Sequence, residues 1–184
     1  MDFRELKEFI KDFLGYIISF LFLFFILAFV VSFQPVAGNS MYPTLKEGDF
    51  VIVSKFFYNI GDPKRNEIVN VKDDLGKSYV KRIIGLPGEK IEYLDNILYI
   101  NDKPFLENFT FEEYMTSNFL FEDICSKEDC PEEIIPKDMY LLLGDNRGES
   151  VDSRTLSFGL RNKKDINGRI IYRIWPANEF GQIE

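Results

Sequence analysis

An uninterrupted apolar segment near the N-terminus constrains this chain more than any other feature of its sequence. Twenty residues, 14–33, read LGYIISFLFLFFILAFVVSF and carry no charged side chain. As an α-helix rising about 1.5 Å per residue, the segment would be about 30 Å long, which matches the hydrocarbon core of a bilayer. It lacks the polar side of a buried core helix, exceeds the roughly 7–15 apolar residues of a cleavable signal peptide, and contains no Gly-x-x-x-Gly pattern for helix pairing. We therefore expect one uncleaved transmembrane helix over 14–33.

Basic residues flank this segment unequally. Three of them precede it: Arg4, Lys7 and Lys11. Only Lys46 lies within the 20 residues that follow it. The cytoplasmic flanks of membrane helices carry an excess of Lys and Arg, and acidic residues count for little in this rule. The sequence thus predicts a cytoplasmic N-terminal segment at 1–13 and an extracytoplasmic domain at 34–184.

The composition excludes several classes of chemistry, because the chain contains no histidine. Without an imidazole there is no Ser-His-Asp or Cys-His catalytic unit and no zinc site built on histidine ligands. Two cysteines are too few for a structural zinc site made of thiolates. The formal net charge of −8 lacks the basic surface that binding to a phosphate backbone requires, so we expect no nucleic-acid partner. Acid–base chemistry must use Lys, Asp, Glu, Tyr or Cys, and we expect no metal or other cofactor.

Residues 34–184 show the pattern of a mainly β domain. Short runs rich in Val, Ile, Tyr and Phe recur between clusters of Gly, Pro, Asp and Asn, whereas helical periodicity is scarce. We expect strands over 50–57, 67–72, 77–84, 91–94, 97–100, 140–143 and 168–175. The runs at 91–94 and 97–100 flank Asp95-Asn96 and are typical of a hairpin. The expected fold is an antiparallel β-sheet domain behind one N-terminal transmembrane helix.

The strand pattern breaks where the sequence becomes acidic and aromatic. We interpret this stretch, about 104–136, as a small inserted subdomain, and one piece of it, 107–115, is compatible with a short helix. Cys125 and Cys130 lie within it, separated by Ser-Lys-Glu-Asp. This spacing allows a local disulfide, which an oxidising compartment would favour. A redox-active or metal-binding pair is the alternative.

Two segments of the outer domain concentrate polar and reactive side chains around serines. Residues 38–45 read GNSMYPTL and place Ser40 shortly after the apolar segment. The same sequence pattern is also compatible with an ordinary serine in a loop. Residues 144–154 read GDNRGESVDSR, with turn formers, two serines, three acids and two arginines. They form either a polar loop braced by ion pairs or the wall of a site.

A third segment, 78–84, places a lysine within an apolar strand. It reads SYVKRII, in which Tyr79, Lys81 and Ile83 share one face because alternate strand residues point the same way. Such a lysine either extends to water, which is the common case, or stays desolvated, which lowers its pKa. At an ordinary pKa near 10.4, only about 0.04% of lysine is neutral at pH 7, and a pKa lower by two or three units raises that fraction about a hundredfold or more. Only the desolvated lysine is suited to act as a general base.

Together these segments resemble the type I signal peptidase family over nearly the whole chain. Behind the expected anchor, four blocks follow in the family's order: SMxPTL at 40–45, Gly-Asp with an apolar strand at 48–53, KRIIGxPGE at 81–89 and GDNRxxSxDSR at 144–154. Each block alone is moderately specific, whereas their order behind an anchor is very specific. The resemblance implies a serine endopeptidase, held in a lipid bilayer, that uses a lysine base and no imidazole. It would cleave signal peptides from exported preproteins after small residues at positions −3 and −1.

The resemblance also implies roles for individual residues. Ser40 corresponds to the nucleophile, Lys81 to the general base that deprotonates it, and Ser150 to a serine that orients the lysine. The Ser40 backbone N–H would be one donor to the oxyanion. Some family members carry a serine two residues before the nucleophile as a second donor, but Gly38 stands here. A second donor must therefore come from the backbone or from water.

Supporting residues and a substrate-binding wall follow from the same motifs. The supporting residues form two expected ion pairs, Arg82 with Asp145 and Arg154 with Asp152. The residues expected to contact the small substrate side chains are Gly38, Met41, Tyr79 and Val80.

Two other functions are compatible with part of this pattern. A self-cleaving, repressor-like protease shares the Ser/Lys pair, but the anchor and the lack of a DNA-binding module argue against it. A membrane-tethered β scaffold in which Ser40 and Lys81 never meet is the non-enzymatic alternative. The distance between the Ser40 hydroxyl and the Lys81 ammonium group separates this scaffold from an enzyme.

Overall fold

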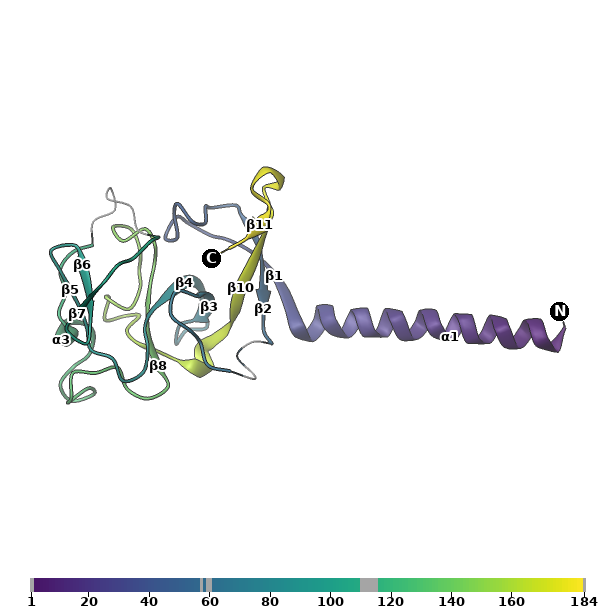
Figure 1. The fold of residues 1–184 in the computed structure, drawn as a ribbon, viewed down its shortest axis with the longest axis horizontal. Coiled ribbons are helices and arrows are strands. Elements are labelled where there is room, and N and C mark those ends of the chain that lie inside the picture. The colour runs from purple at the N-terminus through teal and green to yellow at the C-terminus, as the bar shows by residue number, and fades with distance from the viewer. Residues whose placement is uncertain (1, 57, 59–60, 110–115, 184) are drawn as a thin grey trace.

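The computed structural model describes residues 2–56, 58, 61–109 and 116–183. A long N-terminal helix projects from a domain built of strands (Figure 1). This helix, α1, spans Phe3–Phe25 and continues through a π-helical turn, η1, at Ile26–Val30. Strand β1, Val31–Pro35, follows directly and enters the domain.

Eight strands of the described residues form the main sheet. Their order is β1-β2-β10-β3-β4-β8-β9, with β11 beside β10, and every pairing is antiparallel. After β1, the strands are β2 Phe50–Ser54, β3 Ile68–Lys72, β4 Ser78–Gly85, β8 Met139–Leu143, β9 Arg161–Asn162, β10 Ile166–Trp175 and β11 Gly181–Gln182. Two short 3₁₀ helices flank β10, namely η2 at Lys163–Asp165 and η3 at Ala177–Glu179.

A second, smaller sheet forms the other lobe of the domain (Figure 1). It consists of β5 Ile91–Leu94, β6 Ile97–Ile100 and β7 Lys103–Phe105, and the short helix α3 follows at Phe121–Ile124. The predicted hairpin is therefore confirmed, but it belongs to this lobe, which begins earlier than the insert expected at 104–136. The expected helix at 107–115 falls largely on residues 110–115, outside the described residues.

The predicted local disulfide is confirmed, because Cys125 and Cys130 are bonded to each other. Cys130 and the neighbouring Ile124 are buried in the apolar cluster that joins the second sheet to the main sheet. The loop that the bond closes is thus fixed against the core of the smaller lobe.

Strand β4 lies at the centre of the molecule and is covered on both faces. Its adjacent residues Ile83 and Ile84 belong to different apolar clusters, because successive side chains of a strand point to opposite faces. Ile84 packs with Tyr93 of the second sheet, whereas Ile83 packs with Val69 of β3. The charged residues just before them in β4 are consequently held inside the domain.

The predicted antiparallel β class is confirmed, and each predicted strand is present within a few residues of its expected bounds. The helix predicted over 14–33 needs correction at its end, because Val31, Ser32 and Phe33 are extended in β1. There they pair with Ser54, Val53 and Ile52 of β2. The sheet satisfies their backbone hydrogen bonds, and an apolar run by itself does not distinguish a helix from a buried strand. Within the described ranges, none of the helices combines the length and the apolar character needed to cross a membrane.

Candidate active site

Ser40 lies in a loop after β1 that the loop 144–154 holds in place. The backbone N–H of Asn146 donates to the Ser40 carbonyl at 3.1 Å, and its side-chain amide donates to the Asn39 carbonyl, also at 3.1 Å. Two residues earlier, Gly38 has a φ of +74°, a backbone conformation that side-chain-bearing residues rarely adopt. The Ser40 backbone is therefore positioned by a turn on one side and by loop 144–154 on the other.

Lys81 of β4, the predicted base, contacts both the predicted nucleophile and the predicted orienting serine. Its ammonium nitrogen donates to Ser40 Oγ at 2.8 Å and to Ser150 Oγ at 3.0 Å. The residue pairs with Val69 of β3 and is only 1% exposed. Because the sheet encloses it, Lys81 belongs to the desolvated class of strand lysines and does not extend to water.

Burial changes the acid–base behaviour of Lys81. Desolvation lowers its pKa from the ordinary 10.5 to about 8, even though the carboxylates of Asp152 and Asp145 act in the opposite direction, and Arg154 adds to the lowering. At a pKa of about 8, roughly 10% of the lysine is neutral at pH 7. A neutral amine within hydrogen-bond distance of a serine hydroxyl has the geometry of a general base.

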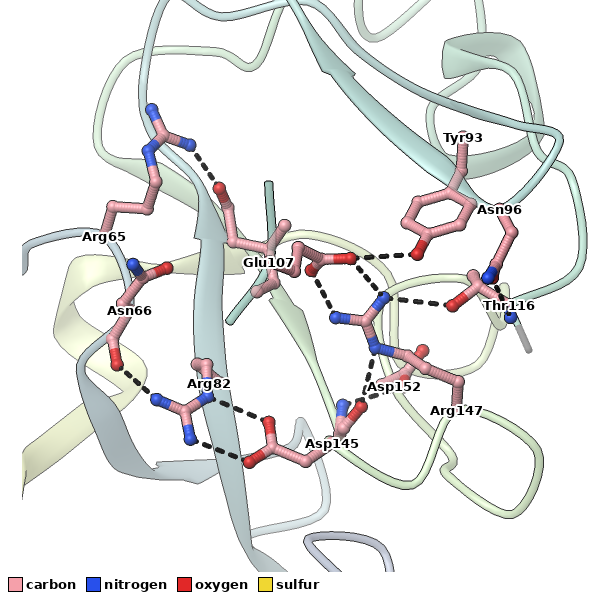
Figure 2. Close-up of polar contacts among 12 residues, drawn as sticks. Arg65, Asn66, Arg82, Tyr93, Asn96, Glu107, Thr116, Asp145, Arg147 and Asp152 are labelled. Atoms are coloured by element: carbon pink, nitrogen blue, oxygen red, sulfur yellow. Dashed lines mark hydrogen bonds and ion pairs between the residues drawn. The ribbon is translucent and has the colours of Figure 1, made fainter. Parts of the chain in front are cut away.

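Arg82, the next residue of β4, forms a buried ion pair with Asp145 (Figure 2). Its Nε and Nη2 atoms donate to the two carboxylate oxygens at 2.9 and 2.7 Å, and its Nη1 donates to the Asn66 carbonyl at 2.8 Å. The Thr44 hydroxyl donates to Asp145 at 2.6 Å. The structure thus contains the first expected pair, and through Thr44 this pair also contacts the loop that carries Ser40.

The second expected pair, Asp152 with Arg154, braces the same loop. Arg154 donates from Nε and from Nη2 to the two oxygens of Asp152, each at 2.8 Å, and the Gly144 N–H donates to Asp152 at 3.0 Å. Burial opposes ionisation of Asp152, but the hydrogen bonds and charge of Arg154 hold its pKa below the usual range. A side chain at Gly144 would collide with the Ser150 hydroxyl and the Ser40 carbonyl, so glycine permits the close approach of the three residues.

A groove of about 470 Å³ runs past Ser40 and Lys81. Gly38, Tyr79 and Val80, three of the four expected wall residues, line it. The first half of β4 pairs with β3 on one edge, and no strand of the described residues pairs with its other edge. An extended peptide in the groove would therefore lie beside an open strand edge.

Met41 does not join the groove, which corrects the expectation that it forms a wall. Its side chain is buried and packs in the core with Val36 and Leu45. The Leu45 N–H donates to the Met41 carbonyl at 2.9 Å, which closes a turn that directs the Met41 side chain inward.

Three further residues of the site were not singled out from the sequence. They are Thr44, Asn146 and Arg147. Each donates a hydrogen bond of 3.1 Å or less: Thr44 to Asp145, Asn146 to Ser40 and Arg147 to Gly144. All three lie inside the family-like blocks, so their position in those motifs was the available signal. Their partners could not be derived from spacing.

Comparisons with known proteins place the chain among signal peptidases. A family model described as signal peptidase, peptidase S26, matches residues 6–175. The chain is 39% identical over 153 residues to signal peptidase IB of Staphylococcus aureus, covering 79% of this chain and 78% of the relative. It is 38% identical over 152 residues to signal peptidase I of Bacillus caldolyticus, covering 79% and 80%. A crystal structure of a signal peptidase I from Enterococcus faecalis V583 matches with a TM-score of 0.50 and 32% identity, over 59% of this chain and 97% of that chain.

Proposed function

The chain belongs to the signal peptidase family, peptidase S26, and on this premise we propose that it is a serine endopeptidase that cleaves signal peptides from exported preproteins. Ser40 is the nucleophile and Lys81 the general base. The observation that carries this proposal is the 2.8 Å distance between Ser40 Oγ and the buried Lys81 Nζ, with Ser150 Oγ 3.0 Å from the same nitrogen. No imidazole is needed for this chemistry, which agrees with a chain that has no histidine.

The reaction follows from a neutral Lys81 beside the serine hydroxyl. Ser40 Oγ attacks the scissile carbonyl carbon while Lys81 takes its proton, and a tetrahedral oxyanion forms. Protonated Lys81 then gives this proton to the leaving amine as the C–N bond breaks, leaving an ester on Ser40. A water molecule, deprotonated by Lys81, hydrolyses the ester and regenerates the free hydroxyl.

The groove accounts for substrate binding in this proposal. A signal peptide binds extended along the open edge of β4, because added strands gain main-chain hydrogen bonds and place alternate side chains into pockets. Gly38, Tyr79 and Val80 are the walls that meet the small side chains at positions −3 and −1. The Ser40 N–H stabilises the oxyanion. Gly38 has no hydroxyl, so a second donor comes from the backbone or from water.

The apolar segment anchors this enzyme to the membrane, with residues 1–13 in the cytoplasm and the β domain outside. None of the described α1 residues is buried by the domain, and Phe20 and Phe22 are 67% and 66% exposed. Strands β1, β2, β10 and β11 lie on the side of the domain from which α1 projects (Figure 1). On these strands and beside them, Phe50, Trp175 and Phe180 are exposed, and Phe50 pairs with Trp175. This face is suited to rest on a lipid surface, where a membrane-inserted substrate presents its cleavage site.

Cleavage of a preprotein by the full chain in detergent tests the catalytic assignment. Ser40→Ala and Lys81→Ala should each abolish cleavage. The matched controls Ser157→Ala and Lys127→Ala change exposed residues and should leave cleavage unchanged. Near-full cleavage by either site variant would contradict the assignment.

Protease treatment of spheroplasts tests the membrane orientation separately. Protease added from outside should digest the β domain, because the proposal places it in the extracytoplasmic space. A domain that stays intact until the membrane is permeabilised would show the opposite orientation.

A further inference from the structure

A second buried arginine, Arg147, connects the loop 144–154 to the smaller lobe (Figure 2). Its Nη1 and Nη2 atoms both donate to the carboxylate of Glu107, which follows β7. The Arg147 side chain has no exposed surface, and that of Glu107 is 4% exposed. A charge pair this deeply enclosed is held by its direct partners, since little solvent is present to screen it.

Two more side chains of the smaller lobe complete this contact. The Tyr93 hydroxyl donates to Glu107 at 2.9 Å, and Arg147 Nη1 donates to the Thr116 hydroxyl oxygen at 3.1 Å. Thr116 is itself held by Asn96, whose side-chain oxygen accepts from the Thr116 N–H at 3.2 Å. Figure 2 shows Glu107 and Thr116 next to the guanidinium group of Arg147, with Tyr93 hydrogen-bonded to Glu107 and Asn96 hydrogen-bonded to Thr116.

On its other side, Arg147 closes a ring of hydrogen bonds within the loop. Its Nε donates to the Gly144 carbonyl at 3.0 Å, and its own carbonyl accepts from Arg154 Nη2 at 2.8 Å. Arg154 pairs with Asp152, and Asp152 accepts from the Gly144 N–H. The ring therefore fixes both the N–H and the carbonyl of Gly144, the residue packed against Ser40 and Ser150.

We infer that the smaller lobe is a positioning element of the active site, with Glu107 and Arg147 as its positioning residues. This inference rests on the proposed function. Glu107, anchored by Tyr93, fixes the Arg147 guanidinium, and Arg147 fixes Gly144. The loop then presents Asn146 to the Ser40 carbonyl and Ser150 to the Lys81 ammonium group. None of these positioning residues touches the reacting atoms.

The energetics of buried ion pairs separate this role from a purely structural one. Removing one partner of such a pair destabilises a protein strongly, whereas replacing both partners by apolar residues of similar size is often neutral or stabilising. An apolar pair restores packing but cannot donate a hydrogen bond to the Gly144 carbonyl. The double variant should therefore keep its stability but lose the hydrogen bond that holds the catalytic loop.

The test compares the full-length wild type with the double variant Arg147→Met/Glu107→Leu, by preprotein cleavage and thermal unfolding in the same detergent. We expect a folded double variant whose kcat falls about tenfold or more, while KM stays within about twofold, because the groove is not contacted by the pair. A folded double variant with kcat within about twofold of wild type would overturn the inference.

A matched double variant provides the control. Lys90 and Glu92 form a partly exposed ion pair of 2.9 Å on the same lobe, and neither takes part in the Glu107–Arg147 contact described above. Lys90→Met/Glu92→Leu should leave kcat unchanged. An equal loss of kcat in this control would overturn the inference, since it would assign the effect to any disturbance of the lobe.

Milder variants decide the question if the first double variant does not fold. Tyr93→Phe and Thr116→Val each remove one hydroxyl from the Glu107–Arg147 contact. Each should lower kcat about two- to fivefold with KM unchanged, and unchanged kcat in both would overturn the inference. Failure of the proposed function would look different, because the wild type itself would not cleave or Ser40→Ala would remain active.

Discussion

The two faces of β4 carry neighbouring cations in opposite surroundings. Lys81 and Arg82 are each 1% exposed. Arg82 donates to both oxygens of Asp145, at 2.9 and 2.7 Å. Lys81 contacts the hydroxyls of Ser40 and Ser150 and, within the part of the chain that the structure describes, makes no ion pair. The same degree of burial thus encloses a paired charge on one face and a charge without a direct counter-ion on the other.

This difference explains how one strand serves both stability and catalysis. A guanidinium group stays protonated under all conditions and suits a bidentate carboxylate, so Arg82 can brace the site permanently. An ammonium group without a counter-ion is destabilised by desolvation, so the pKa of Lys81 falls to about 8.

The largest effect is expected for Lys81→Arg, which makes the two faces chemically alike. The guanidinium group cannot release its proton, so general-base catalysis is lost and kcat/KM should fall about 10³-fold. The fall in kcat/KM is measured by preprotein cleavage in detergent. Lys127→Arg is the control, because Lys127 is exposed and does not line the groove, and its activity should stay within about twofold of wild type. A Lys81→Arg variant with more than about a tenth of the wild-type activity would refute the role of the amine.

The next largest effect is expected for Asp145→Asn on the Arg82 face. Removing the carboxylate leaves the guanidinium buried without a counter-charge, so the free energy of unfolding should fall by about 3–5 kcal/mol. Urea unfolding measures the change. The control is Asp74→Asn, whose side chain is 85% exposed in its pair with Arg161 and should contribute at most about 1 kcal/mol. Equal losses in the two variants would show that burial of the Arg82 pair has no special consequence.

A smaller change in the free energy of unfolding, and in the opposite direction, is expected for Lys81→Met, which should stabilise the fold. The folded-state pKa of about 8 lies below the ordinary 10.5, so at pH 7 keeping Lys81 protonated inside the fold costs about 3 kcal/mol. The methionine variant should therefore be more stable than the wild type by up to this amount at pH 7, and inactive. Between pH 8 and 10.5 the unfolded chain binds more protons than the folded one, so wild-type stability rises with pH and the difference narrows. A stability difference that stays constant from pH 7 to pH 10 would contradict the lowered pKa.

The same contrast shows which parts of the molecule could be predicted from sequence. The strand that carries Lys81 and Arg82 was predictable, because short β-branched runs between turn residues are a local signal. The meeting of Ser40, Lys81 and Ser150 followed from the family-like motifs, since residues this far apart in sequence are joined only by the fold. The Cys125–Cys130 bond was favoured by its short spacing.

Other features depended on contacts that no local pattern encodes. Residues 31–33 end the apolar run, and they form a strand with Gln34 and Pro35 because they pair with the edge of β2. Met41 adjoins the nucleophile but turns into the core. Glu107 is separated from Arg147 by 40 residues of sequence, so their pairing depends on how the smaller lobe folds against the loop.

The most direct test of this contrast is the titration of Lys81 itself. NMR of the full chain labelled with ¹³C and ¹⁵N on its lysines would follow the Cε and Nζ signals with pH, and the Lys81→Met variant would identify the Lys81 signal by its loss. A Lys81 midpoint of about 8, well below the ordinary 10.5, is the result expected for a buried base beside Ser40. A Lys81 midpoint near 10.5 would contradict it, because the amine would then be as fully protonated at neutral pH as a lysine in water.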